Sequence, residues 1–203
     1  MTGIEGAIRR QGFLRLAGVD EAGRGALAGP VVAAAVLLRD GWPIPGVTDS
    51  KQLSRQRREI LSRRILKDAW AVGVGVVEVS TIEVRNILRA TLLAMERAVA
   101  DLVVAPDGIL VDGLAVPPFD LPVFPVARGD LKCPSIGAAS IVAKVTRDRI
   151  MATYHQRYPV YGFDRHKGYG TAAHLRAIEE HGVSPIHRKT FSPLRQIPLP
   201  LTT

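Results

Sequence analysis

Two adjacent carboxylates followed by an arginine between two glycines are the residues of this chain best suited to chemistry. They are Asp20 and Glu21, and then Gly23-Arg24-Gly25. Asp112 and Asp130 each follow another short apolar run and stand beside a glycine. Taken singly, each acid is typical of an ordinary solvated loop. Their repeated position after apolar runs favours one shared site.

The four acids, if they converge, have the composition of a metal centre. Neighbouring strands bring their ends together, and clustered carboxylates raise one another's pKa values unless cations lie among them. Hard oxygen ligands favour Mg²⁺ or Mn²⁺, and no paired His or Cys spacing indicates zinc. Two such ions about 4 Å apart can activate water and stabilise the leaving oxygen of a phosphodiester. We therefore expect a metal-dependent enzyme acting on nucleic acid.

The composition of the 203-residue chain supports a polyanionic partner. Its 27 basic and 19 acidic residues give a net charge of +8, which favours nucleic acid first and an anionic membrane surface second. The longest uncharged stretch near the start, Gly25–Leu38, is too short to cross a bilayer and is predicted to be a buried strand. The single Cys133 fits a reducing compartment, and we expect a cytoplasmic protein.

Alternating and apolar patterns predict one α/β domain over residues 1–203. Residues 1–12 are expected to be a loose lead-in, residues 158–171 a loop, and residues 192–203 a proline-rich tail. The expected strands are Phe13–Val19, Val31–Leu38, Val72–Val79, Gly108–Gly113 and Val123–Val126. The expected helices run from a Ser54 cap to about Lys67, from a Ser80–Glu83 capping box to about Leu102, from Ser135 toward Tyr154, and over Ala172–His181.

Six segments in order carry a family resemblance. They are DEAGRG at Asp20–Gly25, DSKQLS at Asp49–Ser54, VDG at Val111–Gly113, the long segment Gly129–Asp148, YGFDRHKGYGT at Tyr161–Thr171, and HRKTF at His187–Phe191. Together they resemble bacterial ribonuclease HII over about residues 14–192. The resemblance implies a ribonuclease H-like fold, with a mixed five-stranded sheet flanked by helices and an additional C-terminal helical region.

The resemblance also implies an activity. It implies endonucleolytic cleavage of the RNA strand of RNA–DNA hybrids, and of duplex DNA on the 5′ side of an embedded ribonucleotide, leaving 3′-hydroxyl and 5′-phosphate ends. Repair of misincorporated ribonucleotides and other processing of hybrids both stay open as roles. The implied cofactors are two Mg²⁺ or Mn²⁺ ions, and the implied state is a monomer.

The resemblance assigns roles to individual residues. The metal ligands and catalytic acids would be Asp20, Glu21, Asp112 and Asp130. Gly23, Arg24 and Gly25 would read the ribonucleotide, because glycines let the backbone approach a 2′-hydroxyl closely. Tyr169 would lie against the sugar of the next nucleotide, with packing under a loop as the alternative. The expected phosphate contacts are Lys51, Ser140, Lys144, Lys167 and Arg188, although such cations are often merely solvated.

Two other identities remain to be weighed. Ribonuclease HIII shares the fold and usually carries an extra N-terminal substrate-binding domain, whereas only about a dozen residues precede the first expected strand here. A non-catalytic basic RNA-binding protein is the second alternative. It would need no converging acids and would show no Mg²⁺-dependent turnover.

Overall fold

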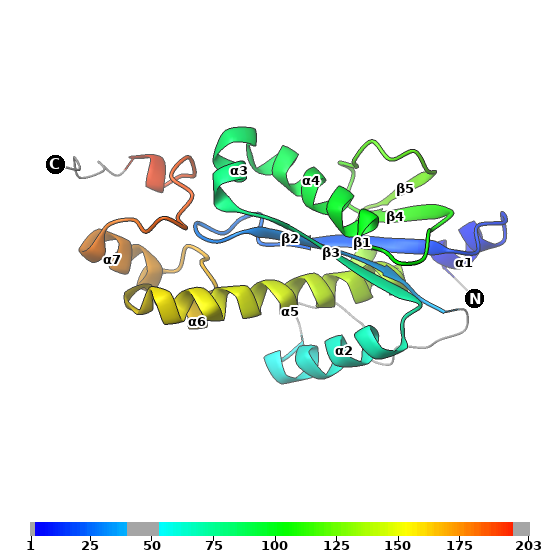
Figure 1. Cartoon of the computed structure of the whole chain (residues 1–203), viewed down its shortest axis with the longest axis horizontal. Coiled ribbons are helices and arrows are strands. Elements are labelled where there is room, and N and C mark those ends of the chain that lie inside the picture. Colours follow the sequence, from blue (N-terminus) through cyan, green and yellow to red (C-terminus); the bar gives the residue numbers. More distant parts are fainter. Residues whose placement is uncertain (1–2, 40–52, 197–203) are drawn as a thin grey trace.

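One mixed sheet of five strands forms the centre of the described structure (Figure 1). The computed structural model describes residues 3–39 and 53–196. The strands are β1 (Leu16–Ala22), β2 (Val31–Leu37), β3 (Ala71–Val77), β4 (Gly108–Asp112) and β5 (Val123–Val126), in the order β3-β2-β1-β4-β5. β1 pairs antiparallel with β2 and parallel with β4, so the strand carrying Asp20 lies at the middle of the sheet.

Helices cover both faces of this sheet, which explains why β1 and β2 are apolar almost throughout. The first face packs against α4 (Ile87–Ala100), preceded by the short α3 (Val79–Arg85). The second face packs against the long α5 (Pro134–Arg157), with α2 (Arg55–Asp68) lying along it. Figure 1 shows α4 and α5 on opposite sides of the strands.

The remaining short elements lie at the two ends of the chain and beside the sheet. α1 (Ile4–Arg9) precedes β1, and the 3₁₀ turn η1 (Gly129–Leu131) joins β5 to α5. After α5 come η2 (Pro159–Tyr161), α6 (Phe163–His166), α7 (Ala172–His181) and η3 (Leu194–Gln196). Their apolar side chains form a small core of their own with Leu27, Ala28 and Met151. This is the additional C-terminal helical region that the family resemblance implied.

Several local predictions were wrong in detail. Residues 4–9 of the expected loose lead-in form a helix, because Ile8 packs under the sheet and the buried Glu5 accepts hydrogen bonds from Ser135. Within the expected loop, residues 159–161 and 163–166 are helical. Leu194, in the expected tail, is buried in the C-terminal core. In each case tertiary packing orders a segment whose local pattern is weak.

The helix expected from a Ser80–Glu83 capping box was also misjudged. The N-cap is Glu78, two residues before Ser80, so the helix begins at Val79 and no side chain caps it. It is interrupted at Asn86, whose φ of 65° lies in the left-handed region. The Asn86 side chain then accepts a hydrogen bond from the Arg89 N–H and starts α4. One expected helix is therefore two.

Glycines let the helices approach the sheet closely. A Cβ built on Gly75 would lie 2.0 Å from the Ala94 carbonyl oxygen, and one on Gly73 would lie 2.1 Å from that of Ala98. A Cβ on Gly18 would lie 2.2 Å from the backbone of Ser135. α4 therefore rests directly on β3, and the first turn of α5 rests directly on β1.

We predict that Gly75→Ala lowers the free energy of unfolding by about 1–3 kcal/mol, because the methyl group meets helix backbone that cannot rotate away. Denaturant unfolding followed by circular dichroism measures the change. Gly25→Ala is the matched control, because a Cβ at Gly25 would have nothing within 4 Å. Equal stability of the two variants would contradict the proposed close contact.

Candidate active site

The carboxylates of β1 and β4 meet at one pocket. In the parallel pairing of β1 with β4, Val19 lies opposite Val111. The residues that follow this pair, Asp20 and Asp112, are therefore neighbours. Asp20, Glu21 and Asp112 therefore lie together at the ends of adjacent parallel strands. Asp20 and Glu21 belong to β1 itself and pair with β2, rather than following the strand as predicted. The pocket has a volume of about 290 Å³ and is lined by Asp20, Glu21, Ala22, Gly23, Arg24, Gly25, Asp112, Ser140, Lys144 and Tyr169.

The fourth predicted acid, Asp130, lies in the adjacent turn and is not among the lining residues. The Gly129 N–H donates to Asp112 Oδ1 at 2.6 Å, which ties this turn to the pocket. Asp130 Oδ1 accepts from the Leu131 N–H at 3.1 Å. Among residues 3–39 and 53–196, no three His, Cys, Asp or Glu side chains converge closely enough as they stand to hold one ion. The structure thus brings three acids together and leaves Asp130 beside them.

Burial and mutual repulsion destabilise the ionised acids. Burial raises the pKa of Asp20 well above its ordinary value, and the charges of Glu21 and Asp112 raise it further, while a hydrogen bond with Ser140 opposes the shift. Burial likewise raises the pKa of Glu21, against the opposing effect of Arg24. Arg24 Nη1 lies 3.2 Å from Glu21 Oε1, and half of the Arg24 side chain stays exposed. A site with this excess of buried negative charge favours the binding of cations.

The two glycines of Gly23-Arg24-Gly25 serve different purposes. Gly23 has a φ of +96°, and a Cβ there would lie 2.0 Å from Arg147 Nε, so its place is set by the protein interior. Gly25 lines the pocket and has nothing within 4 Å of the place where a Cβ would stand. Of the two glycines, Gly25 is therefore the one that no protein atom crowds.

Arg188 does not have the position predicted for a phosphate contact. Its exposure is 0%, and it donates to the Arg24 carbonyl at 2.8 Å and to the Gly29 carbonyl at 3.0 and 2.8 Å. Burial lowers the pKa of Arg188 to about 9. The side chain holds the Gly-Arg-Gly segment from beneath, so a phosphate cannot reach it without rearrangement.

Arg147 is the functional neighbour that the sequence did not reveal. It is fully buried and donates to the carbonyls of Ala28, Pro30 and Lys167, each at 2.9 Å. It thereby joins the segment after β1 to the segment that carries Tyr169. One arginine within a polar stretch of α5 is typical of a solvated helix face, so no local signal distinguishes it.

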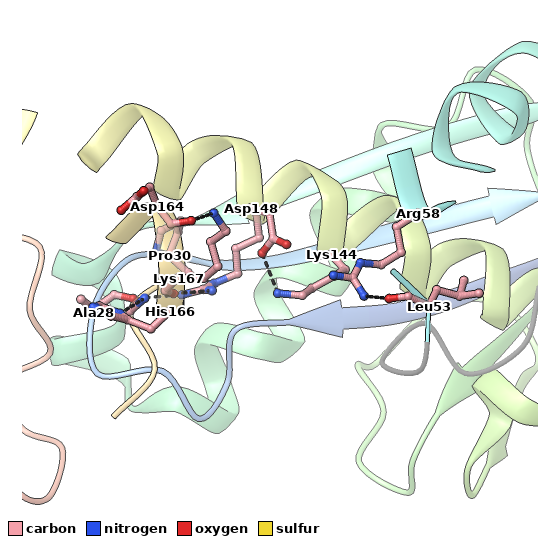
Figure 2. Close-up of polar contacts among 11 residues, drawn as sticks. Ala28, Pro30, Leu53, Arg58, Lys144, Asp148, Asp164, His166 and Lys167 are labelled. Atoms are coloured by element: carbon pink, nitrogen blue, oxygen red, sulfur yellow. Dashed lines mark hydrogen bonds and ion pairs between the residues drawn. The ribbon is translucent and has the colours of Figure 1, made fainter. Parts of the chain in front are cut away.

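The predicted lysines differ from one another. Lys144 lines the pocket and pairs with Asp148 at 2.6 Å, as Figure 2 shows. Lys167 is only 7% exposed, and its ammonium donates to the Asp164 carbonyl (Figure 2). Its contact with phosphate stays a prediction. Lys167 follows the last residue of α6 with a left-handed backbone. Lys51 lies outside the described residues.

Tyr169 forms one wall of the pocket. Its ring centroid lies 5.4 Å from the Arg147 guanidinium carbon and 5.7 Å from Lys144 Nζ. The residue is 36% exposed, so the ring lies near two cations and keeps part of its surface open. Ser140, from α5, reaches the same pocket and hydrogen-bonds with Asp20. The structure thus places the Gly-Arg-Gly segment, three of the four predicted acids and Tyr169 around one cavity.

Comparison with known families agrees with this arrangement. The family model described as Ribonuclease HII matches residues 17–193. The chain belongs to the ribonuclease HII family. Members of this family are type 2 ribonucleases H, which are hydrolases, so the alternative of a non-catalytic RNA-binding protein is not supported.

Curated relatives support the assignment over nearly the whole chain. Ribonuclease HII of Geobacter metallireducens is 55% identical over 193 residues, covering 95% of this chain and 91% of the relative. Ribonuclease HII of Bacillus subtilis is 48% identical over 195 residues, covering 96% of this chain and 76% of the relative. These relatives are type II enzymes, as the resemblance of the six segments to ribonuclease HII implied.

Solved structures confirm the ribonuclease H-like fold. The ribonuclease H2 of Pyrococcus horikoshii OT3 superposes with a TM-score of 0.76 at 28% identity, covering 90% of this chain and 96% of that one. Bst-RNase HIII in complex with Mn²⁺ superposes with a TM-score of 0.66 at 19% identity, covering 94% and 71%. The second similarity is one of fold alone.

None of the described helices is both long and apolar enough to span a bilayer.

The raised pKa of Asp20 leads to a prediction about stability. A carboxyl group whose pKa is raised on folding destabilises the folded protein when it is ionised, so stability falls as pH rises through that pKa. In EDTA at pH 7.5, Asp20→Asn should therefore raise stability by about 1 kcal/mol, which is ~2–4 °C in the unfolding midpoint. Thermal melts of both proteins measure this difference.

Asp107→Asn is the control of opposite sign. Its two carboxylate oxygens accept from the Leu14 and Arg15 N–H groups at 3.0 and 2.9 Å, and an amide can accept only one of these bonds. We expect Asp107→Asn to lower the midpoint. A lower midpoint for Asp20→Asn as well would refute the electrostatic imbalance at the pocket.

Proposed function

We propose that this protein cleaves the RNA strand of RNA–DNA hybrids and nicks duplex DNA on the 5′ side of an embedded ribonucleotide, leaving 3′-hydroxyl and 5′-phosphate ends. The observation that carries the proposal is the single pocket shared by three carboxylates, the Gly-Arg-Gly segment and Tyr169. A net charge of +8 suits such a substrate. We further propose that residues 1–203 act as one cytoplasmic, monomeric catalytic domain.

Asp20, Glu21, Asp112 and Asp130 would hold two Mg²⁺ or Mn²⁺ ions. The donor set fits, because all four groups are hard oxygen ligands and burial with mutual repulsion already favours cations at Asp20 and Glu21. Bound there, such ions supply an activated water and neutralise charge on the leaving oxygen. The Gly129 N–H, by donating to Asp112, keeps the turn that contains Asp130 beside the other acids.

The residues around the acids would orient the substrate. Gly25 leaves room for a ribose against the backbone, where amide and carbonyl groups can bond to a 2′-hydroxyl that DNA lacks. Lys144 at the pocket wall would attract the phosphate, although it must share its charge with Asp148. The exposed face of Tyr169 would rest on the sugar of the following nucleotide. Cleavage and sugar recognition are thereby proposed for one cavity.

Arg24 has two possible tasks in this arrangement. Its carbonyl is fixed by Arg188, whereas its side chain is half exposed and pairs with Glu21. When cations occupy the acids, this ion pair weakens, because Glu21 then shares its charge with them. The guanidinium is then available to a phosphate of the substrate. In the absence of cations it acts as a partial counterion for Glu21.

The proposed activity is tested with a DNA duplex that carries one ribonucleotide. Purified protein with Mg²⁺ or Mn²⁺ should nick this duplex on the 5′ side of the ribonucleotide, and the all-DNA duplex should stay intact. Denaturing gels with end-labelled strands identify the position and the ends. An uncut ribonucleotide substrate at high enzyme concentration would overturn the proposal.

Asp112→Asn should abolish cleavage while leaving duplex binding measurable. Loss of several kcal/mol of charge stabilisation corresponds to a decrease of ~10²-fold or more in rate. Single-turnover cleavage and fluorescence anisotropy separate the two effects. Asp120→Asn is the matched control, because Asp120 is an exposed acid outside the pocket. Full activity of Asp112→Asn would remove Asp112 from the proposed site.

Gly25→Ala should keep the fold and lose recognition of the ribose. The added methyl group occupies pocket space that is otherwise open, so we expect kcat/KM on the single-ribonucleotide duplex to fall about tenfold or more, equivalent to ~1.4 kcal/mol. Steady-state cleavage at matched folded protein measures this. Unchanged kcat/KM would show that the substrate does not approach Gly25.

A further inference from the structure

Two fully buried histidines form a hydrogen-bonded chain that ends on the backbone of Tyr169. His174 and His187 are 0% and 1% exposed, and their Nε2 atoms lie 3.0 Å apart. His174 comes from α7, and His187 lies in the segment that follows it. Both rings pack against the ring of Phe163. Nothing in the proposed chemistry uses either side chain.

The hydrogen bond at the Ser184 end of the chain decides which nitrogen of each histidine carries the proton. His187 Nδ1 lies 2.8 Å from the Ser184 N–H, which can only donate, so Nδ1 is the acceptor and Nε2 carries the proton. His187 Nε2 then donates to His174 Nε2. The proton of His174 is therefore on Nδ1, which donates to the Tyr169 carbonyl at 3.0 Å. One set of tautomers satisfies all three bonds.

The chain requires both rings to be neutral. A second proton on His174 would place N–H groups on both facing Nε2 atoms. A second proton on His187 would leave the Ser184 N–H without its acceptor nitrogen. Burial, reinforced by the neighbouring imidazole, lowers the pKa of each histidine to about 4. The neutral pair is therefore the state of the protein at neutral pH.

His166 holds the other side of the same segment. Its Nδ1 accepts from the Gly168 N–H at 3.2 Å, so its proton lies on Nε2 and is donated to the Tyr161 carbonyl at 2.6 Å. Its ring stacks on that of His174 with centroids 4.3 Å apart. Gly168 in turn accepts from the Leu27 N–H at 2.8 Å, next to the segment that carries Gly25. The backbone of residues 168 and 169 is thus held by two imidazoles.

We propose that His174 and His187 are positioning residues for substrate recognition, which hold Tyr169 in the active-site pocket through a hydrogen-bond chain of fixed direction. The proposal rests on the proposed role of Tyr169 at the sugar of the second nucleotide. The ring of Tyr169 can face that sugar only if its backbone stays in place. Its carbonyl accepts hydrogen bonds from His174 Nδ1 at 3.0 Å and from the Thr171 N–H at 2.8 Å, and the His174 bond is the one that a side chain supplies. A purely structural pair would stabilise the C-terminal core without affecting the choice of substrate.

The first test observes the tautomers directly and needs no activity. In the full chain labelled with ¹⁵N-histidine, two-bond ¹H–¹⁵N spectra at pH 7 should show Nδ1–H for His174 and Nε2–H for His187. The Tyr169 carbonyl ¹³C shift should move in His174→Leu and stay near the wild-type value in His174→Asn, whose amide can replace the Nδ1 donor. An Nε2–H tautomer at His174, or an unmoved carbonyl shift in His174→Leu, would overturn the proposal.

The second test measures substrate choice. We expect His174→Leu to lose about tenfold in kcat/KM on a duplex with one ribonucleotide, relative to a continuous RNA–DNA hybrid, and His174→Asn to recover most of the loss. His181→Asn is the control, because His181 is an exposed residue at the end of α7. Equal losses on both substrates, or no recovery with asparagine, would indicate a structural pair and reject the positioning role.

Tyr169→Ala separates this proposal from the one it rests on. If Tyr169→Ala keeps the wild-type substrate preference, the proposed role of Tyr169 is wrong and the positioning role falls with it, even where the tautomers agree. If Tyr169→Ala loses the preference and His174→Leu keeps it, only the positioning role fails. If His174→Leu does not fold, the tautomers and the His174→Asn carbonyl shift still decide the case.

Discussion

Two buried guanidinium groups hold the active-site loops of this protein together. Arg147 and Arg188 are fully buried, and all their described hydrogen bonds go to backbone carbonyls between Arg24 and Pro30 or at Lys167. Burying such a charge costs several kcal/mol, and each charged hydrogen bond returns about 1.5–3 kcal/mol. The charges are therefore tolerable only while these carbonyls stay where they are. The loops and the two arginines stabilise each other.

This mutual stabilisation keeps the Gly-Arg-Gly segment and Tyr169 beside the same cavity. Arg188 donates a hydrogen bond to the Arg24 carbonyl, and Arg147 fills the space beside Gly23. Arg147 also donates to the carbonyl of Lys167, in the turn before Tyr169. β1 contains Asp20 and Glu21 and leads directly into the loop that the two arginines hold. Arg147 and Arg188 thus put positive charge against the backbone of the Gly-Arg-Gly segment, next to the carboxylates of Asp20 and Glu21.

The sequence predicted what depends on local pattern and missed what depends on distant contacts. The strand at Val31, the helix capped by Ser54 and the helix at Ala172–His181 follow from periodicity and capping, and the structure has them within a residue or two. α1 and the break at Asn86 depend on burial of Glu5 and on a left-handed backbone, which no local pattern encodes. Likewise Arg188 and Lys167 carry the charge expected of phosphate contacts, but their carbonyl partners bury them.

The residues of the DEAGRG segment are each constrained by a different part of the structure. In Asp20–Gly25 the acids are disfavoured in their charged form, Gly23 is required by the arginine behind it, and Gly25 has open space at its Cβ position. A substitution at Gly23 would therefore disturb Arg147, whereas one at Gly25 would leave the protein interior unchanged. Because Arg24 is fixed through its carbonyl and not its side chain, its guanidinium can change partners as charge enters the pocket. Under the proposed function, the segment would combine a fixed backbone beside the acids with an arginine side chain whose ion pair with Glu21 can be exchanged.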